Sequence, residues 1–377
     1  MKNFILPDYT NSNLNISATV AEYLGAPNKN ATLPILADEL GRDYKNIVFI
    51  CFDGMGTYPL GANPDEPAFL RENTRQTLVS TFPSTTTNAT TSLLTNRLPI
   101  EHGWFGWTLH FKDLGRNIDI FKAKDSVTGE AITEEYIPSR ATEYYFYHTD
   151  GRYNINTVFP EYVEIAHPEV NTVFDTLDEM FESIKSICEK DGKQFIYAYY
   201  PDPDTTMHVH GIDSDEAKAV IRSISDGLEA LSHTDDTLFI VTADHGQSPV
   251  EDYADLCGDE KLMDMLEVHP FLEPRAPAFI VKDEAKAKFE DYFTEKYGEG
   301  FLLRRSADLV REGFFGDPAY SAGFEDLLGD YIAIGTYAHV QAILNPNKRR
   351  YFGHHTSLTE EMEVPLIMFG KKSAAGD

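Results

Sequence analysis

The sequence predicts an α/β fold in which a doubly wound, mostly parallel sheet carries helices on both faces. Three short, continuous apolar runs are typical of strands that are buried on both sides: residues 46–52, 194–200 and 237–242. Two segments with helical spacing of apolar residues, 172–189 and 214–231, separate these runs. Alternation of strand and helix along a chain is the pattern of parallel α/β sheets.

The remaining segments complete one α/β domain over residues 1–377. A fourth apolar run, 363–369, predicts a further strand near the end of the sequence. Residues from about 108 to 165 are rich in Tyr, Phe, Thr and Glu and predict an inserted segment, either covering the substrate or packed on the sheet. Residues from about 250 to 345 combine an amphipathic stretch at 283–297 with glycine-rich turns, and we expect a smaller α/β subdomain there.

Composition limits the class of partner. The chain has 377 residues, of which 42% are hydrophobic, so it is long enough to bury a large core. Its formal charge of -29 argues against binding a nucleic-acid polymer or an anionic membrane surface. A small phosphorylated substrate, such as a nucleotide or a phosphodiester, remains compatible with this charge if bound cations supply a local positive centre.

The cysteines and the lengths of the apolar runs indicate the cellular compartment in which the protein is expected. Cys51, Cys188 and Cys257 are odd in number and widely spaced, so they predict neither a disulfide framework nor a metal-binding pair. The apolar run before Pro7 has three residues, too few for a secretory signal, and no stretch is long enough to span a membrane. We therefore expect a cytoplasmic protein; the sequence gives no indication of its oligomeric state.

Carboxylates and imidazoles follow the predicted strands, where open α/β sheets place their ligands. Asp53 follows the first run, Asp204 lies just beyond the second, and Asp244 with His245 follows the third. Any one of these could be an ordinary turn residue, but three strands that deliver carboxylates to one edge predict a functional site. His208 lies four residues after Asp204 and would share its side of a helix, so both could reach one cation.

A hydroxyl-rich turn precedes the apolar positions Leu93 and Leu94. Pro83 and the Ser/Thr cluster over residues 84–92 are typical of a helix N-terminus, which attracts phosphate through its free amides and its dipole. Helix capping would explain one threonine, but residues 85–87 are three threonines in succession.

The order and spacing of these motifs resemble the alkaline phosphatase superfamily, and within it the type I phosphodiesterase/nucleotide pyrophosphatase branch. The resemblance runs from about residue 46 to 369 and includes His102-Gly103 and Gly353-His354-His355. It implies two divalent cations, zinc in the first place with manganese or magnesium as alternatives. The implied ligands are Asp204, His208 and His355 for one cation, and Asp53, Asp244, His245 and Thr86 for the other.

The same resemblance implies the chemistry. Thr86, located by counting back from His102-Gly103, would be the nucleophile that forms a covalent phospho-threonine intermediate, with Thr85 and Thr87 as chemically equivalent neighbours. Two cations about 4 Å apart can clamp the entering and leaving oxygens of an in-line displacement. Trp107 stands where the branch usually has an asparagine that contacts substrate, so we expect a different substrate size or orientation.

Three alternatives accompany a phosphodiesterase or nucleotide pyrophosphatase. A phosphomonoesterase and a phosphonoacetate-type hydrolase could use the same metal core, although no Arg or Lys stands close to Thr86 before Arg97. A catalytically silent protein that binds metal or a phospholigand is the alternative of another class. A sulfatase is disfavoured because the Thr85–Thr87 segment has no Cys or Ser followed by Pro and Arg.

Overall fold

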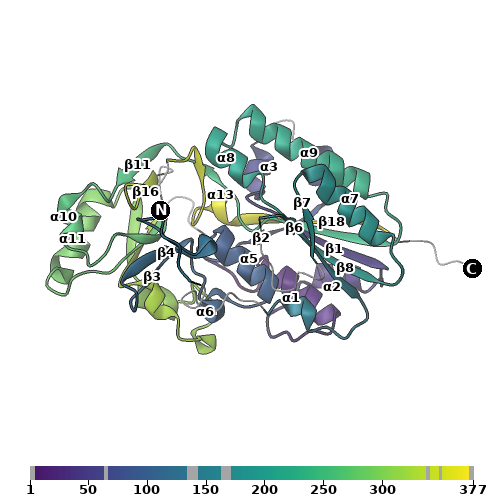
Figure 1. The fold of residues 1–377 in the computed structure, drawn as a ribbon, viewed down its shortest axis with the longest axis horizontal. Helices are drawn as coiled ribbons and strands as arrows, with labels where there is room; N and C mark the ends of the chain where they lie inside the picture. The colour runs from purple at the N-terminus through teal and green to yellow at the C-terminus, as the bar shows by residue number, and fades with distance from the viewer. Residues whose placement is uncertain are drawn as a thin grey trace, which may run out of the picture.

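A computed structural model describes residues 5–62, 67–133, 143–162, 171–336, 340–347 and 350–372. The described chain builds two seven-stranded sheets (Figure 1). The sheet with the longer strands, called the larger sheet from here on, has the strand order β2-β18-β9-β1-β8-β6-β7. Its strands are β1 (Asn46–Phe52), β2 (Thr74–Val79), β6 (Asn154–Pro160), β7 (Asn171–Phe174), β8 (Gln194–Tyr200), β9 (Thr237–Thr242) and β18 (Glu363–Lys371).

The larger sheet is parallel over five neighbouring strands and antiparallel at one edge. β1 pairs in parallel with both β8 and β9, while β18 runs antiparallel to β9 and β2. All seven residues of β1 are buried, which explains why its sequence is continuously apolar rather than alternating. The predicted doubly wound, mostly parallel α/β fold is confirmed.

Helices cover both faces of this sheet (Figure 1). One face carries α7 (Leu177–Cys188) and α9 (Asp215–Leu231); the other carries α1 (Leu14–Tyr23), α2 (Pro34–Leu40) and α5 (Thr86–Thr95). Shorter helices connect the strands: α3 (Thr57–Gly61), α4 (Ala68–Asn73), α6 (Pro99–His102), α8 (Asp204–His210) and α13 (Thr359–Met362). None of the described helices combines the length and apolar character that a bilayer crossing requires.

Three predicted helices begin later than their sequence pattern suggested. Residues 172–174 of the segment 172–189 belong to the edge strand β7, which ends at Phe174, and Thr176 then caps α7. The Thr176 side chain accepts a hydrogen bond from the Glu179 amide, and Glu179 completes a capping box. Similarly, Ser214 caps α9 and lies outside it, and the amphipathic stretch 283–297 forms α11 from Lys286 to Tyr297.

The second sheet is antiparallel and has the order β14-β15-β13-β12-β3-β4-β5. Its strands are β3 (Thr108–Phe111), β4 (Arg116–Asp119), β5 (Lys124–Asp125), β12 (Phe271–Glu273), β13 (Ala276–Phe279), β14 (Phe301–Arg305) and β15 (Tyr331–Gly335). Helices α10 (Glu260–Met263), α11 and α12 (Ser306–Arg311) accompany it, together with the strand pairs β10 (Ser248–Pro249) with β17 (Gly353–His354) and β11 (Asp252–Asp255) with β16 (Val340–Ile343).

The segment from about 108 to 165, expected as one insertion, is divided between the two sheets. Its first strands, β3 to β5, join the second sheet, whereas β6 joins the larger one. Residues 134–142 and 163–170 lie outside the described part of the chain. The second sheet therefore combines two stretches that are far apart in sequence and that meet where β3 pairs with β12. Strands β3 and β4 lie to one side of the larger sheet (Figure 1).

Candidate active site

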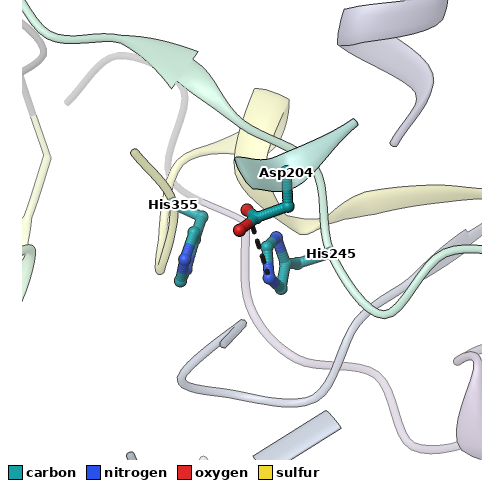
Figure 2. A group of neighbouring side chains, drawn as sticks. All are labelled: Asp204, His245 and His355. Atoms are coloured by element: carbon teal, nitrogen blue, oxygen red, sulfur yellow. Dashed lines mark ion pairs between the residues drawn. The ribbon is translucent and has the colours of Figure 1, made fainter. Parts of the chain in front are cut away.

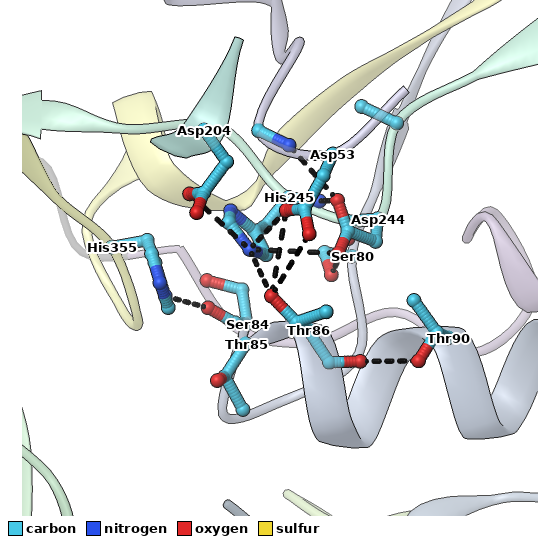
Figure 3. Close-up of polar contacts among 12 residues, drawn as sticks. Asp53, Ser80, Ser84, Thr85, Thr86, Thr90, Asp204, Asp244, His245 and His355 are labelled. Carbon is cyan, nitrogen blue, oxygen red and sulfur yellow. Dashed lines mark hydrogen bonds and ion pairs between the residues drawn. The ribbon is translucent and has the colours of Figure 1, made fainter. Parts of the chain in front are cut away.

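Three buried carboxylates meet at the carboxyl ends of β1, β8 and β9 (Figure 3). Asp53 follows β1, Asp244 follows β9, and Asp204 begins α8 just after β8. Backbone hydrogen bonds fix them relative to one another: the Asp204 amide donates to the Asp53 carbonyl (3.0 Å), and the Gly54 amide donates to Asp244 Oδ1 (3.0 Å). Parallel strands thus bring together residues that are separated by up to 191 positions in the sequence (53 to 244).

Three imidazoles present the same nitrogen to this cluster. The Nδ1 atoms of His208, His245 and His355 donate to the backbone carbonyls of Gly353 (2.7 Å), Gly246 (2.9 Å) and Ser84 (2.8 Å). A ring that binds a metal is neutral and carries one N–H, so with that hydrogen on Nδ1 the Nε2 lone pair of each ring would face the cluster. Such backbone bonds are the usual way in which proteins orient histidine ligands toward a metal.

The donor atoms form two groups that could each hold a cation. In the first, donor atoms of Asp53, Asp244 and His245 lie within 4.8 Å of one another; in the second, so do those of Asp204, His245 and His355 (Figure 2). His245 lies between the groups, with Nε2 at 3.2 Å from Asp53 Oδ1 and 4.0 Å from Asp204 Oδ1. His208, expected in the second group, has Nε2 at 3.3 Å from Asp204 Oδ2.

The electrostatics of the cluster fit a bound cation. Burial, together with the nearby charge of Asp53, raises the pKa of Asp244 well above its usual range. Burial also raises the pKa of Asp53, and the Asp204 carboxylate adds to that shift. Asp244 Oδ2 is buried without a hydrogen-bond partner in the described part of the chain. The nearest cationic partner of this oxygen is His245, with Nε2 at 3.5 Å, and a divalent cation bound there would stabilise the buried carboxylate further.

The histidines of the cluster differ in charge. Burial and the neighbouring His245 hold the pKa of His355 well below its usual range, so its ring is neutral and can donate a lone pair. For His245, burial alone would lower the pKa, but Asp244 and Asp53 outweigh it and raise the pKa to about 10. For Asp204, His208 outweighs burial and lowers the pKa to about 2. Oxygen and imidazole donors of this kind suit zinc and also manganese.

The three successive threonines have different environments. Thr85 is buried, and its hydroxyl donates to Glu273 Oε1 (2.7 Å). Thr87 is also buried. Thr86 begins α5, and its Oγ1 lies 3.3 Å from both Asp53 Oδ2 and His245 Nε2. Figure 3 shows Thr86 pointing toward the cluster and the Thr85 side chain pointing away from it.

Sequence reasoning missed several residues that hold the cluster. The Tyr199 hydroxyl donates to Asp53 Oδ2, and Gln247 Nε2 donates to both the carbonyl and the carboxylate of Asp204. Glu273 reaches the site from β12 in the second sheet. Tyr199 lies in the predicted strand 194–200 and Gln247 follows a predicted ligand by two positions, so only proximity to those features marked them.

Trp107 directly precedes β3 and shares a hydrogen-bond partner, Glu273, with Thr85. Its ring is half-buried and stacks on Phe121, with ring centroids 5.7 Å apart, and Lys122 Nζ lies 5.4 Å from the same ring. Its backbone amide donates to Glu273 Oε1 (2.6 Å). The expected role of Trp107 in substrate binding stays a prediction.

His102, part of the motif from which Thr86 was located, has a structural role. Its ring is buried, accepts the Trp104 amide at Nδ1 (3.0 Å), and bonds Ser92 Oγ through Nε2 (2.9 Å). These bonds tie α5 to the loop after α6. Burial lowers the pKa of His102 from 6.5 to about 3.

This pKa predicts a pH-dependent contribution to stability. Between pH 6.5 and about 3 the unfolded chain binds a proton at His102 that the folded chain does not bind, so stability falls as pH falls through this window. We expect wild type to lose about 2 kcal/mol relative to His102→Asn between about pH 7.5 and about pH 5. Urea unfolding of both proteins at the two pH values measures this difference. A difference that does not change with pH would contradict the prediction.

Known proteins resemble the chain in sequence family and in fold. A family model described as type I phosphodiesterase/nucleotide pyrophosphatase matches residues 47–298. No sequence among curated proteins matches the chain. Murine ectonucleotide pyrophosphatase/phosphodiesterase 5 superposes with a TM-score of 0.64 at 17% identity, covering 86% of this chain and 88% of the murine one.

Two further solved structures share the fold. An inactive threonine-to-alanine variant of the murine protein, in complex with AMP, superposes with a TM-score of 0.62 at 16% identity and covers 87% of this chain and 91% of its own. Phosphonoacetate hydrolase from Sinorhizobium meliloti 1021, in complex with phosphonoformate, superposes with a TM-score of 0.59 at 15% identity and covers 88% and 91%. At these identities the likeness is one of fold.

Proposed function

The chain belongs to the type I phosphodiesterase/nucleotide pyrophosphatase family of metal-dependent phosphoester hydrolases, within the alkaline phosphatase superfamily, and from this premise we propose that it cleaves small phosphodiesters or nucleotide pyrophosphates by attack of Thr86. The observation that carries the proposal is the placement of Thr86 Oγ1 against both Asp53 and His245. Thr85 is turned away to Glu273 and Thr87 is buried, so of the three threonines Thr86 is the one that faces the cluster.

A solved relative supports this choice. The murine protein that is described as inactive carries a threonine-to-alanine substitution and was captured with AMP. The same chemistry here would use a threonine nucleophile and a nucleotide-like substrate. Contacts to Thr86 Oγ1 within the described part of the chain come from Asp53 and His245 and include no Arg or Lys. That environment favours a diester over a monoester, because a monoester carries additional negative charge.

We assign the cations to the two groups of donors, with zinc as the expected metal. Asp53, Asp244 and His245 would hold one cation; Asp204 and His355, with His208 beside them, would hold the other. When bound, two divalent cations supply positive charge to the oxygens of the transferring phosphoryl group.

The protein's own residues would orient the nucleophile. Thr86 Oγ1 donates its hydrogen to the Asp53 carboxylate, which leaves the oxygen lone pairs for attack on phosphorus. In the proposed reaction the Thr86 O–P bond forms as the bond from phosphorus to the leaving alcohol or phosphate breaks. Thr86 gives up its hydroxyl proton and the leaving oxygen takes up one proton, so the step needs no net proton. Water then cleaves the phospho-threonine and restores the Thr86 hydroxyl.

Substrate class is tested by turnover of paired chromogenic esters. Protein loaded with zinc, manganese or magnesium is expected to hydrolyse bis-p-nitrophenyl phosphate with a kcat/KM at least about tenfold above that for p-nitrophenyl phosphate. A preference for the monoester would replace this proposal with a phosphomonoesterase. Phosphate release from phosphonoacetate, with neither ester cleaved, would identify C–P hydrolysis, and no turnover of any of them would indicate a silent binding protein.

A further inference from the structure

Glu273 connects the second sheet to the segment that carries Thr86. It ends β12, is 2% exposed, and its Oε1 accepts the Thr85 hydroxyl (2.7 Å) and the Trp107 amide (2.6 Å). Burial removes the competition of water for these two hydrogen bonds. The Glu273 carboxyl group thus joins three segments that are distant in sequence: β12, the residue before β3 and the N-terminus of α5.

The bond to Glu273 changes what Thr85 does for its helix. Thr85 occupies the N-cap position of α5 with extended backbone angles (φ -144°, ψ 150°), yet its side chain makes no capping hydrogen bond. A threonine at this position ordinarily accepts an amide hydrogen from the first turn. Here the hydroxyl is turned to Glu273 instead. The orientation of Thr85, and with it the direction of the backbone that leads into Thr86, therefore depends on a residue of the second sheet.

The same turn contacts the opposite side of the site. Arg275, two residues after Glu273, is fully buried, and its Nε lies 2.7 Å from Glu361 Oε1. Glu361 Oε2 in turn accepts the amides of Ser357 (2.7 Å) and Leu358 (2.9 Å), which follow His355 by two and three residues. The turn between β12 and β13 therefore holds both the Thr86 segment and the loop that carries His355.

The two residues before Thr86 are held by hydrogen bonds from two directions. The Ser84 amide donates to the Thr356 carbonyl (2.9 Å), and the Ser84 carbonyl accepts His355 Nδ1 (2.8 Å). Thr85 is held from the other direction by Glu273. Thr86 itself is only half-buried, so packing alone leaves its hydroxyl less restrained than its neighbours.

We propose that Glu273 is a positioning residue of the reaction, which sets the orientation of the Thr86 hydroxyl through its hydrogen bond to Thr85. The inference rests on Thr86 being the nucleophile, as proposed above. Glu273 bonds the residue before the nucleophile and does not touch the reacting atoms, so its loss acts on geometry. A misplacement of a reacting group by about 1 Å can cost about 100-fold in rate.

The test uses substitutions that change one hydrogen bond and little volume. Thr85→Val removes the donor, and we expect kcat for a phosphodiester to fall at least about tenfold while KM stays within about twofold. Thr85→Ser keeps the hydroxyl and is expected to restore kcat to near the wild-type value. Glu273→Gln weakens the acceptor, and the double variant with Thr85→Val is expected to lose much less than the product of the two single effects.

Controls separate this inference from folding and from the proposed function. Thr95→Val removes a hydroxyl at the other end of α5, where it bonds only the Thr91 carbonyl in the described structure (2.7 Å), and is expected to leave kcat unchanged. Bound metal and melting temperature, measured for every variant, show whether each one is folded. With an active wild type, a Thr85→Val variant that behaves like Thr95→Val, or single effects that multiply fully, would overturn the positioning role alone. An inactive wild type would overturn the proposed function and this inference with it.

Discussion

Replacing Thr86 with alanine is expected to lower kcat for a phosphodiester by about three orders of magnitude or more while leaving the bound metal at its wild-type level. The substitution removes the oxygen that is proposed to attack phosphorus. Its Oγ1 contacts Asp53 and His245 at 3.3 Å but is not required to hold them, because backbone hydrogen bonds position both. Steady-state kinetics and metal analysis of the same preparation measure the two effects together.

A covalent readout identifies the nucleophile directly. Acid quenching during turnover of a diester is expected to leave the phosphoryl group, with its retained alcohol, on the peptide that contains Thr86 in wild type and not in Thr86→Ala. Thr87→Val is the matched control, because Thr87 is the buried neighbour with the same functional group, and it is expected to retain turnover. Full activity in Thr86→Ala, or loss of activity in Thr87→Val alone, would move the nucleophile elsewhere.

The central strands could be predicted because each is buried on both faces. Strands β1, β8 and β9 are covered by helices on both faces, so their sequences are continuously apolar and their ends are marked by the first polar residues. The run 363–369 also forms a strand, but apolar composition does not reveal direction. Its antiparallel pairing with β9 and β2 follows from the path of the chain.

The ends of helices and strands were less predictable where a strand pattern runs directly into a helix pattern. Val173 and Phe174 fit the helical spacing of the stretch that follows them, yet they belong to edge strand β7. The capping box of Thr176 and Glu179 marks the true start of α7 and was visible in the sequence. The division of residues 108–165 between two sheets was not visible, because it depends on pairing with β12 more than 150 positions later.

The site residues also divide into those that a local sequence pattern marks and those that only contacts between distant segments reveal. Asp53, Asp204, Asp244 and His245 could be singled out because they follow predicted strands, and His208 because of its spacing from Asp204. The resemblance to a known family added His355 and Thr86. Glu273 could not be found in this way, because it follows a strand of only three residues and meets Thr85 across 188 positions. Contacts between two sheets leave no local pattern in the sequence.

Removal of metal is expected to abolish turnover and also to destabilise the protein. Chelation would leave Asp53, Asp204 and Asp244 buried together at the strand ends with only the neighbouring histidines to offset their charge. We expect the melting temperature to fall on dialysis against a chelator and to recover with zinc, in parallel with the recovery of diester hydrolysis. Unchanged activity in protein shown to be free of metal would contradict the assignment of these residues as ligands.

Asp244→Asn is expected to have opposite effects on activity and on the stability of the metal-free protein. Turnover should be lost, because an amide oxygen is a weaker ligand than a carboxylate. The free energy of unfolding without metal should rise by about 1–3 kcal/mol, because the substitution removes a charge that burial and Asp53 disfavour.

The pH dependence of that gain follows from the sign of the pKa shift. The folded-state pKa of Asp244 is raised. The free energy of unfolding of the metal-free wild type therefore falls as pH rises from the ordinary aspartate range toward the raised value, whereas asparagine does not titrate. The advantage of Asp244→Asn should therefore grow across that window and vanish at lower pH, where both side chains are neutral. Urea unfolding of the two metal-free proteins over a pH series measures it, and a metal-free Asp244→Asn protein less stable than wild type at neutral pH would show that the carboxylate serves the fold as well as the metal.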